Sequence, residues 1–239
     1  YINVWGFSIG WGKRLRWPDD YFTLTTDLSY TRYDLKNWSY FLVSNGSCNN
    51  IALNIALRRS STDNNIYPRS GSEFELSLSI TPPYSLWDGI DYKNLATNYQ
   101  SATYQEELQK KYRFIEYHKW KFKFRNFTAL TGGNKCPVLM TRVEFGLLGS
   151  YNKYKKSPFE TYYMGGDGTS GYSSTYATET VGLRGYENGS LTPQGYTGYA
   201  YSRMTLELRY PLMMSNSTNI FALAFVEGGN AWDDVRNFN

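Results

Sequence analysis

The chain has 239 residues, with 25 Lys and Arg against 21 Asp and Glu. A formal net charge of only +4 gives no basic excess, so we expect no nucleic-acid partner. Two cysteines and one histidine are too few for a disulfide framework or a zinc site, and we predict no metal and no cofactor. Mean hydropathy is −0.54, and no stretch approaches the ~20 apolar residues of a membrane helix.

The strand signal is clearest at residues 119–125, which read KWKFKFR. Side chains of a strand alternate between two faces, so this pattern places cations on one face and aromatic rings on the other. In a soluble sheet the cations would face outward to water, whereas in a membrane barrel they would line the interior. The pattern therefore predicts a strand and leaves open which face is outside.

The same alternation recurs along the whole chain. Each instance has the ~10-residue length of a strand that crosses an outer membrane at a tilt, so we expect about eight antiparallel strands. They cover residues 5–12, 21–30, 51–58, 73–80, 119–128, 139–147, 203–210 and 220–232.

The connections between these segments strictly alternate between short and long. In an up-and-down meander, alternate connections lie at the same end, and membrane barrels have short turns at one end and long loops at the other. A soluble sandwich built from Greek keys has no reason to show this asymmetry, so the two patterns together favour a transmembrane β-barrel. The short links are residues 13–19, 60–72, 129–137 and 213–219, and the long ones are 35–49, 82–117 and 149–200.

A membrane barrel assigns a role to each face of these strands. We expect the rings of KWKFKFR to touch lipid and its cations to face a wet lumen, with counter-charge from Glu73, Glu75 and Glu144. Aromatic residues at strand ends would form the two interface girdles. These are Trp11 and Trp17 beside the short turns, and Tyr30, Tyr33 and Trp38 beside the long loops.

The last long connection and the two strands after it carry the most specific motifs. The connection contains YYMGGDG at 162–168 and VGLRGYENG at 181–189; the strands contain TLELRYP and FVEGGNAW. This succession resembles the Omp85 superfamily of outer-membrane proteins. The signature of that family is an Arg-Gly-aromatic tetrapeptide in a long loop, preceded by a Gly-Gly element and followed by two strands with inward acids. The turn that contains YPRSG also resembles a family turn.

The resemblance implies a set of site residues by position. The tetrapeptide would lock the loop inside the barrel, with two acids as its lumenal partners. Tyr186 stands where many members have Phe, and the link 82–117 is longer than the family leads us to expect. The predicted site residues are the motif Leu183, Arg184, Gly185 and Tyr186, the acids Glu207 and Glu227, and the loop glycines Gly165, Gly166, Gly228 and Gly229.

The chemistry of a confined lumen supports these assignments. A guanidinium is tolerated there only when it is hydrogen-bonded to carboxylates, so Arg184 needs such partners. Glu207 alternates with the apolar residues of its strand, so it faces the lumen. Strict alternation groups Glu227 with Leu223 and Phe225, and a bulge at Gly228 and Gly229 is one way to turn it inward. We expect Gly185 to permit the close turn and Tyr186 to anchor the loop tip.

The fold that follows is an all-β, antiparallel, up-and-down transmembrane β-barrel segment. The resemblance implies that residues 1–239 form the middle and later part of one sixteen-stranded barrel domain, with POTRA domains and the first and last strands outside the chain. The resemblance implies a Gram-negative outer-membrane assembly factor that inserts β-barrel proteins and is not an enzyme. Its partners would be unfolded outer-membrane β-barrel clients, accessory outer-membrane lipoproteins and outer-membrane lipid.

Three other functions compete with this interpretation. A dedicated Omp85-type translocator, as in two-partner secretion, would share the motif and differ in client range. A porin-like transporter would conduct ions with its loop in place. A soluble carbohydrate-binding sandwich would use its Tyr and Trp side chains as sugar platforms, and partitioning into membranes would exclude it.

Overall fold

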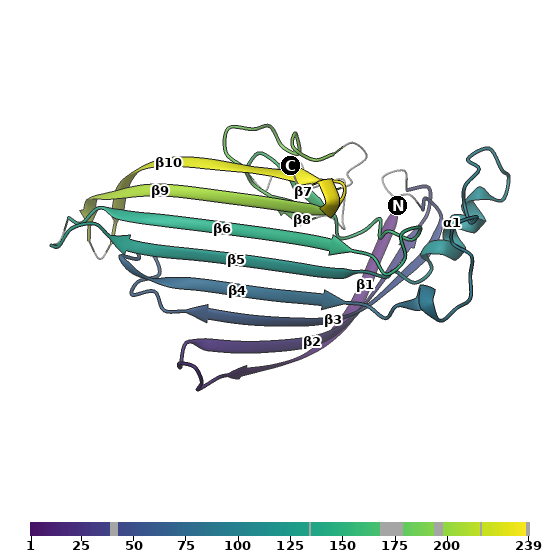
Figure 1. Cartoon of the computed structure of the whole chain (residues 1–239), viewed down its shortest axis with the longest axis horizontal. Coiled ribbons are helices and arrows are strands. Elements are labelled where there is room, and N and C mark those ends of the chain that lie inside the picture. Colours follow the sequence, from purple (N-terminus) through teal and green to yellow (C-terminus); the bar gives the residue numbers. More distant parts are fainter. Residues whose placement is uncertain (39–42, 134, 168–178, 194–197, 216, 238–239) are drawn as a thin grey trace.

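The computed structural model describes residues 1–38, 43–133, 135–167, 179–193, 198–215 and 217–237. Within them the main sheet has eight strands in the order β1-β2-β3-β4-β5-β6-β9-β10, and every neighbouring pair is antiparallel. Figure 1 shows these strands as one curved sheet with β1 and β10 at its edges. The predicted up-and-down, all-β segment is confirmed. The strands are β1 (Ile2–Arg14), β2 (Phe22–Leu35), β3 (Gly46–Ser60), β4 (Ser70–Ile80), β5 (His118–Ala129), β6 (Val138–Gly149), β9 (Ala200–Met214) and β10 (Asn219–Trp232).

Most strands are longer than the hydrophobic alternation predicts. β3 begins at Gly46 and pairs with β2 through a polar stretch that includes Cys48, which the sequence pattern places in a long link. These added residues are polar and interrupt the apolar period, so the alternation alone does not reveal them as strand. Cys48 and Cys136 are both free and buried.

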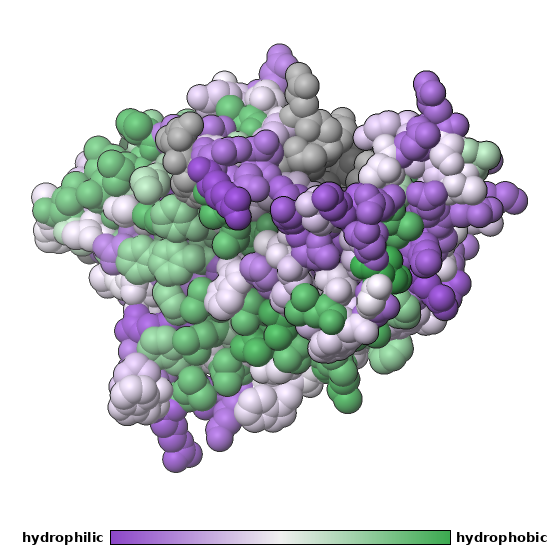
Figure 2. Space-filling model, turned by 45° about the vertical axis from the view of Figure 1, so that its right-hand side comes forward, coloured by the Kyte–Doolittle hydropathy of each residue, from purple (hydrophilic) through white to green (hydrophobic). Residues whose placement is uncertain are grey.

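One face of the sheet is apolar from strand to strand. Phe122 on β5 lies opposite Leu76 on β4 and Phe145 on β6, and Leu76 lies opposite Leu57 on β3. Figure 2 shows apolar side chains gathered over the strands and hydrophilic ones around the loops at the right of the view. Several of these large apolar side chains are exposed in the chain alone, as expected of the lipid face of a membrane barrel.

The opposite face carries a charged row across five strands. Cations and carboxylates alternate along it, so each charge has an opposite charge on the neighbouring strand. The face therefore suits a wet lumen. In order of pairing the row is Arg58, Glu75, Lys123, Glu144 and Arg203.

The long link between β4 and β5, residues 82–117, forms a folded unit that we call the cap segment. It contains the short 3-10 turn η1 (Tyr84–Leu86) and the helix α1 (Tyr104–Tyr112), which lies beyond the end of the sheet in Figure 1. Acidic residues in the first turn of α1 and basic ones in its last turn suit the helix dipole. A further 3-10 turn, η3, covers Val235–Asn237. In the described part of the chain, no helix has the length and apolar character needed to cross a membrane.

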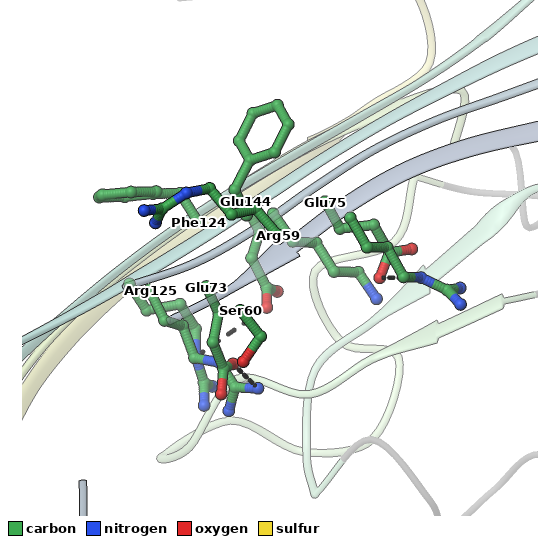
Figure 3. Close-up of a pocket in the computed structure, with 11 residues that line it drawn as sticks. Arg59, Ser60, Glu73, Glu75, Phe124, Arg125 and Glu144 are labelled. Carbon is green, nitrogen blue, oxygen red and sulfur yellow. Dashed lines mark ion pairs between the residues drawn. The ribbon is translucent and has the colours of Figure 1, made fainter. Parts of the chain in front are cut away.

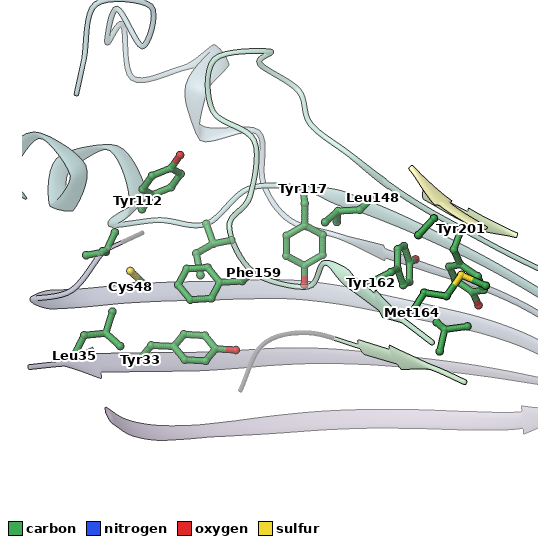
Figure 4. Packing of buried hydrophobic residues seen from close by; sticks show 14 of the residues in the cluster. Tyr33, Leu35, Cys48, Tyr112, Tyr117, Leu148, Phe159, Tyr162, Met164 and Tyr201 are labelled. Carbon is green, nitrogen blue, oxygen red and sulfur yellow. The ribbon is translucent and has the colours of Figure 1, made fainter. Parts of the chain in front are cut away.

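A hydrophobic cluster fills the inside of the sheet near its long-loop end. It joins β2 and β3 to the cap segment and to the connection between β6 and β9 (Figure 4). Tyr33 stacks on Phe159 with ring centroids 5.1 Å apart, and Trp38 packs against the same cluster. The prediction that Tyr33 and Trp38 belong to a lipid girdle is therefore wrong, because both contact the interior core.

The assignment of faces predicts an asymmetric response to charge on β2. Leu28→Arg places a cation on the lipid face near mid-strand, where the cost is ~2–4 kcal/mol. Thr25 of the same strand lies between Gly12 and Ala56 on the lumenal face. We therefore expect Thr25→Arg to lower the free energy of unfolding by less than ~1 kcal/mol. Urea unfolding of the full-length parent protein in lipid vesicles measures both, and equal costs would contradict the assigned faces.

Candidate functional site

The connection between β6 and β9 folds back along the inner face of the sheet, and we call it the folded-back loop (residues 150–199). It contains β7 (Tyr162–Met164) and β8 (Glu179–Val181), which pair in parallel. Tyr162 packs edge-on against Tyr201 of β9, with ring centroids 4.6 Å apart. The ring of Tyr201 lies only 2.2 Å from where a Cβ on Gly146 would stand, so this close approach requires glycine.

Two glycines let the loop turn so that it pairs with the segment that carries the Leu183–Tyr186 motif. Gly165 and Gly166 have φ of +126° and +71°, a region that other residues rarely adopt. The Gly165 amide donates to the Val181 carbonyl at 3.0 Å, and the Leu183 amide donates to the Gly166 carbonyl at 3.0 Å. Leu183 is fully buried in the interior cluster. The Gly-Gly element thus positions the residue that precedes Arg184.

Arg184 contacts both predicted acids. Its Nε donates to Glu227 Oε2 at 2.9 Å, and its backbone amide donates to the same oxygen at 3.2 Å. Its two Nη atoms lie 3.3 Å from Glu207 Oε2. The side chain of Glu227 is 1% exposed and that of Glu207 is 6% exposed, so both carboxylates need such partners.

The sheet supplies the remaining donors to these carboxylates. Arg203 donates through Nε to Glu227 Oε1 at 2.8 Å, and the Thr205 hydroxyl donates to the same oxygen at 2.9 Å. Arg209 Nε donates to Glu207 Oε1 at 2.6 Å. Each acid therefore has one oxygen directed to the loop and the other to the sheet, an arrangement that joins the two.

The inward direction of Glu227 comes from plain alternation. Glu227, Phe225 and Leu223 lie opposite Thr205, Glu207 and Arg209, so all three share the lumenal face. The register shift of β10 lies between Ile220 and Phe221, so a bulge at Gly228 and Gly229 does not turn Glu227 inward.

Phe225 faces inward because it has a partner there. The guanidinium carbon of Arg184 lies 3.5 Å from the centroid of the Phe225 ring, a cation–π contact. Sequence reasoning missed this residue because an aromatic ring in a barrel strand is normally assigned to the lipid face. The available signal was that Phe225 lies two residues from the lumenal Glu227 and so shares its face of the strand.

Two of the three lysines of KWKFKFR, Lys119 and Lys121, form ion pairs with the folded-back loop. Lys119 Nζ lies 3.1 Å from Glu160 and 2.9 Å from Glu179, and Lys121 Nζ lies 3.2 Å from Glu179. Neither loop glutamate was predicted, because both lie in a segment without strand period.

The three predicted counter-charges bind other cations of the sheet. Glu73 pairs with Arg125, Glu75 pairs with Arg58 at 3.2 Å, and Glu144 lies 3.8 Å from Arg203. Of these three pairs, that of Glu73 involves a cation of KWKFKFR, namely Arg125.

A cavity of about 380 Å³, lined by charged side chains together with Phe74 and Phe124, lies against this charged wall. Figure 3 shows Glu73, Arg125 and Glu144 pointing into it from neighbouring strands. Charged side chains on its lining fit a water-filled lumen rather than a dry core.

The remaining predicted residues have less direct contact with the network. Gly185 adopts φ of +87°, which suits the turn beside Arg184. Tyr186 is 50% exposed, so the buried anchor of the motif is Leu183 rather than Tyr186. A Cβ on Gly229 would stand 2.8 Å from Met164 of the loop, whereas Gly228 has open space around it.

Comparison with known proteins agrees with this geometry. The Omp85 superfamily domain matches residues 2–239. The chain belongs to the Omp85 superfamily. It is 25% identical over 187 residues to the outer membrane protein assembly factor BamA of Neisseria meningitidis serogroup B, covering 73% of this chain and 18% of that protein. The chain therefore spans less than a fifth of the length of this relative, and its family places it in the bacterial outer membrane.

A solved structure has the same fold. The crystal structure of BamA from Haemophilus ducreyi lacking POTRA domains 1–3 superposes with a TM-score of 0.66 at 17% sequence identity. The match covers 97% of this chain and 42% of the solved chain. The eight-stranded sheet thus has the fold of part of that solved chain.

The network predicts that Glu227 contributes more than Glu207 to the docking of the folded-back loop. Glu227→Gln removes a charge shared by Arg184 and Arg203, and we expect the docked loop to lose on the order of 3 kcal/mol. Glu207→Gln leaves the shorter Arg184 bonds in place and should have a smaller effect. Limited proteolysis of the full-length parent, with cleavage within residues 150–199 mapped by mass spectrometry, measures loop docking.

Glu75→Gln is the matched control, because Glu75 pairs with Arg58 within the sheet and has no ion pair with the described part of the loop. Its cleavage pattern should match that of the unchanged protein. Equal protection in all three variants would contradict the assigned network.

Proposed function

We propose that this chain is part of an outer-membrane assembly factor that folds and inserts β-barrel proteins. Membership of the Omp85 superfamily supports the general role, and the similarity to a BamA assembly factor supports the specific one. We further propose that residues 1–239 are a partial barrel domain, accompanied in the parent protein by POTRA domains and further strands. Its clients would be unfolded outer-membrane β-barrel proteins.

The physical basis of such insertion is pairing at a sheet edge. Unpaired backbone amides and carbonyls cannot remain in lipid, so a client strand needs a partner strand as it enters. An exposed edge at a seam between the first and last strands of the barrel provides this partner through backbone hydrogen bonds. This process needs no nucleotide and no chemical step, so we propose no enzymatic activity and no cofactor.

In this proposal the seam lies outside the segment, and these residues supply the lumen wall and the loop lock. The observation that carries the proposal is the contact of Arg184 with both Glu227 and Glu207. One loop side chain is thereby tied to β9 and β10, the last two strands in the order of the sheet. A docked loop would hold these strands in the shape that the seam requires.

Two further partners complete the proposal. The apolar face, with residues such as Leu76 and Phe122, would contact outer-membrane lipid. Accessory outer-membrane lipoproteins of a Bam-type complex would bind the parent protein.

A dedicated translocator for one secreted protein is the alternative function. It would use the same barrel, and the 25% identity to the BamA relative does not separate the two. Client range separates them, since a translocator serves one protein and an assembly factor serves many.

The proposal predicts that Arg184→Ala slows client folding. Removing the guanidinium leaves the buried Glu227 and Glu207 without their loop partner, and the loop should leave the lumen. With the full-length parent in lipid vesicles, we expect the folding rate of an added unfolded β-barrel protein to fall by ~10-fold or more. The protease-resistant, folded form of the client reports the rate.

Arg58→Ala is the control, because Arg58 is a lumenal arginine that pairs with Glu75 within the sheet. It should keep the folding rate of the unchanged protein. If Arg184→Ala also keeps that rate and the protease protection of its loop, the proposed lock is wrong.

A further inference from the structure

The cap segment and the folded-back loop are joined by a buried ion pair. Glu116 lies just before β5, and Lys155 lies in the folded-back loop, where it precedes β7. Lys155 Nζ is 3.5 Å from Glu116 Oε2, and the two side chains are 3% and 0% exposed. Removing two charges from water is unfavourable unless each is well bonded, so the pair indicates a contact that the fold maintains.

Further polar groups complete the surroundings of both charges. Glu116 accepts hydrogen bonds from the Ser85 amide at 2.8 Å and from the Ser85 hydroxyl at 2.6 Å. Lys155 donates to the Tyr92 hydroxyl at 3.2 Å and lies 4.6 Å from the centroid of the Tyr92 ring. Asp88 accepts from the same Tyr92 hydroxyl. Burial lowers the pKa of Lys155, and nearby Glu116 acts against this shift.

The pair lies where the folded-back loop begins its path into the lumen. Between Lys155 and β7, Phe159 stacks on Tyr33 and Glu160 binds Lys119. The amide of Tyr162 in β7 then donates to the Gly198 carbonyl at 2.8 Å. Along the chain, the Lys155 contact therefore precedes a series that continues through β7 and the Gly-Gly element to Arg184.

We propose that Glu116 and Lys155 are positioning residues that clamp the folded-back loop to the cap segment and thereby hold Arg184 on its two acids. The proposal deepens the proposed function and rests on it only for the link to client folding. The cap segment, which is longer than the family resemblance predicts, then has a purpose. It supplies the carboxylate that fixes the start of the loop.

Hydrogen exchange of the full-length parent in lipid nanodiscs tests the clamp. The amides of Tyr162, Gly165 and Leu183 report on the docked loop, because each donates to a carbonyl within it. Glu116→Gln leaves the Lys155 charge buried without its carboxylate, and these amides should exchange ~10-fold faster or more. Amides of β5, such as that of Lys123, should keep their protection, which separates loop release from unfolding.

A second substitution distinguishes a charge clamp from simple packing. In Glu116→Gln combined with Lys155→Met, the unpaired cation is gone, and the side-chain amide at position 116 keeps an oxygen that can accept from Ser85. Loop protection should therefore recover relative to Glu116→Gln alone. Lys156→Met is the control, because Lys156 pairs with Asp234 at the surface, where both side chains are 38% exposed. It should leave the exchange rates unchanged.

The outcomes separate the clamp from the function. Unchanged exchange in Glu116→Gln, or no recovery in the double variant, would overturn the clamp whatever the clients do. Faster exchange at the loop amides with recovery in the double variant supports it. If the client folding rate in vesicles follows the same order of variants, the link to assembly is supported; a constant rate would overturn that link and leave the clamp standing.

Discussion

Buried carboxylates in the lumen wall are the constraint on which the arrangement of this segment depends. Glu227 is almost fully enclosed, and Arg203 of the neighbouring strand satisfies only one of its oxygens. The other oxygen binds Arg184 from a distant part of the chain. An uncompensated charge in this position would cost several kcal/mol, so the wall and the loop stabilise each other. The position of the loop is a consequence of that electrostatic requirement.

The same principle operates at three depths along the folded-back loop. At the outer end Lys155 binds Glu116, further in Glu160 and Glu179 neutralise Lys119, and at the motif Arg184 binds Glu227. Apolar contacts such as Tyr162 against Tyr201 fill the space between these pairs. Each pair joins a loop residue to a group outside the loop. Release of the loop would therefore break all of these ion pairs at once.

Features that depend on neighbouring residues could be predicted from the sequence, whereas features that depend on contacts between distant residues could not. The eight strands and the inward direction of Glu207 follow from a period of two, which is a local property. Phe225 has the same strand parity as Glu227, so its inward direction is a local property, but its contact with Arg184 joins distant parts of the chain and is not. The contact of Tyr33 with Phe159 and those of Glu160 and Glu179 with Lys119 were missed because they also join distant parts of the chain. The cap segment has no simple period, and its clamp exists only through contacts made after the sheet has formed.

The most direct test of the proposed assembly role is depletion of the full-length parent protein in its own host. Quantitative proteomics of the outer membrane would follow all integral β-barrel proteins as the parent declines. The proposal predicts that most of them decrease together. Loss of a single secreted protein while the other barrels persist would contradict it and identify a dedicated translocator.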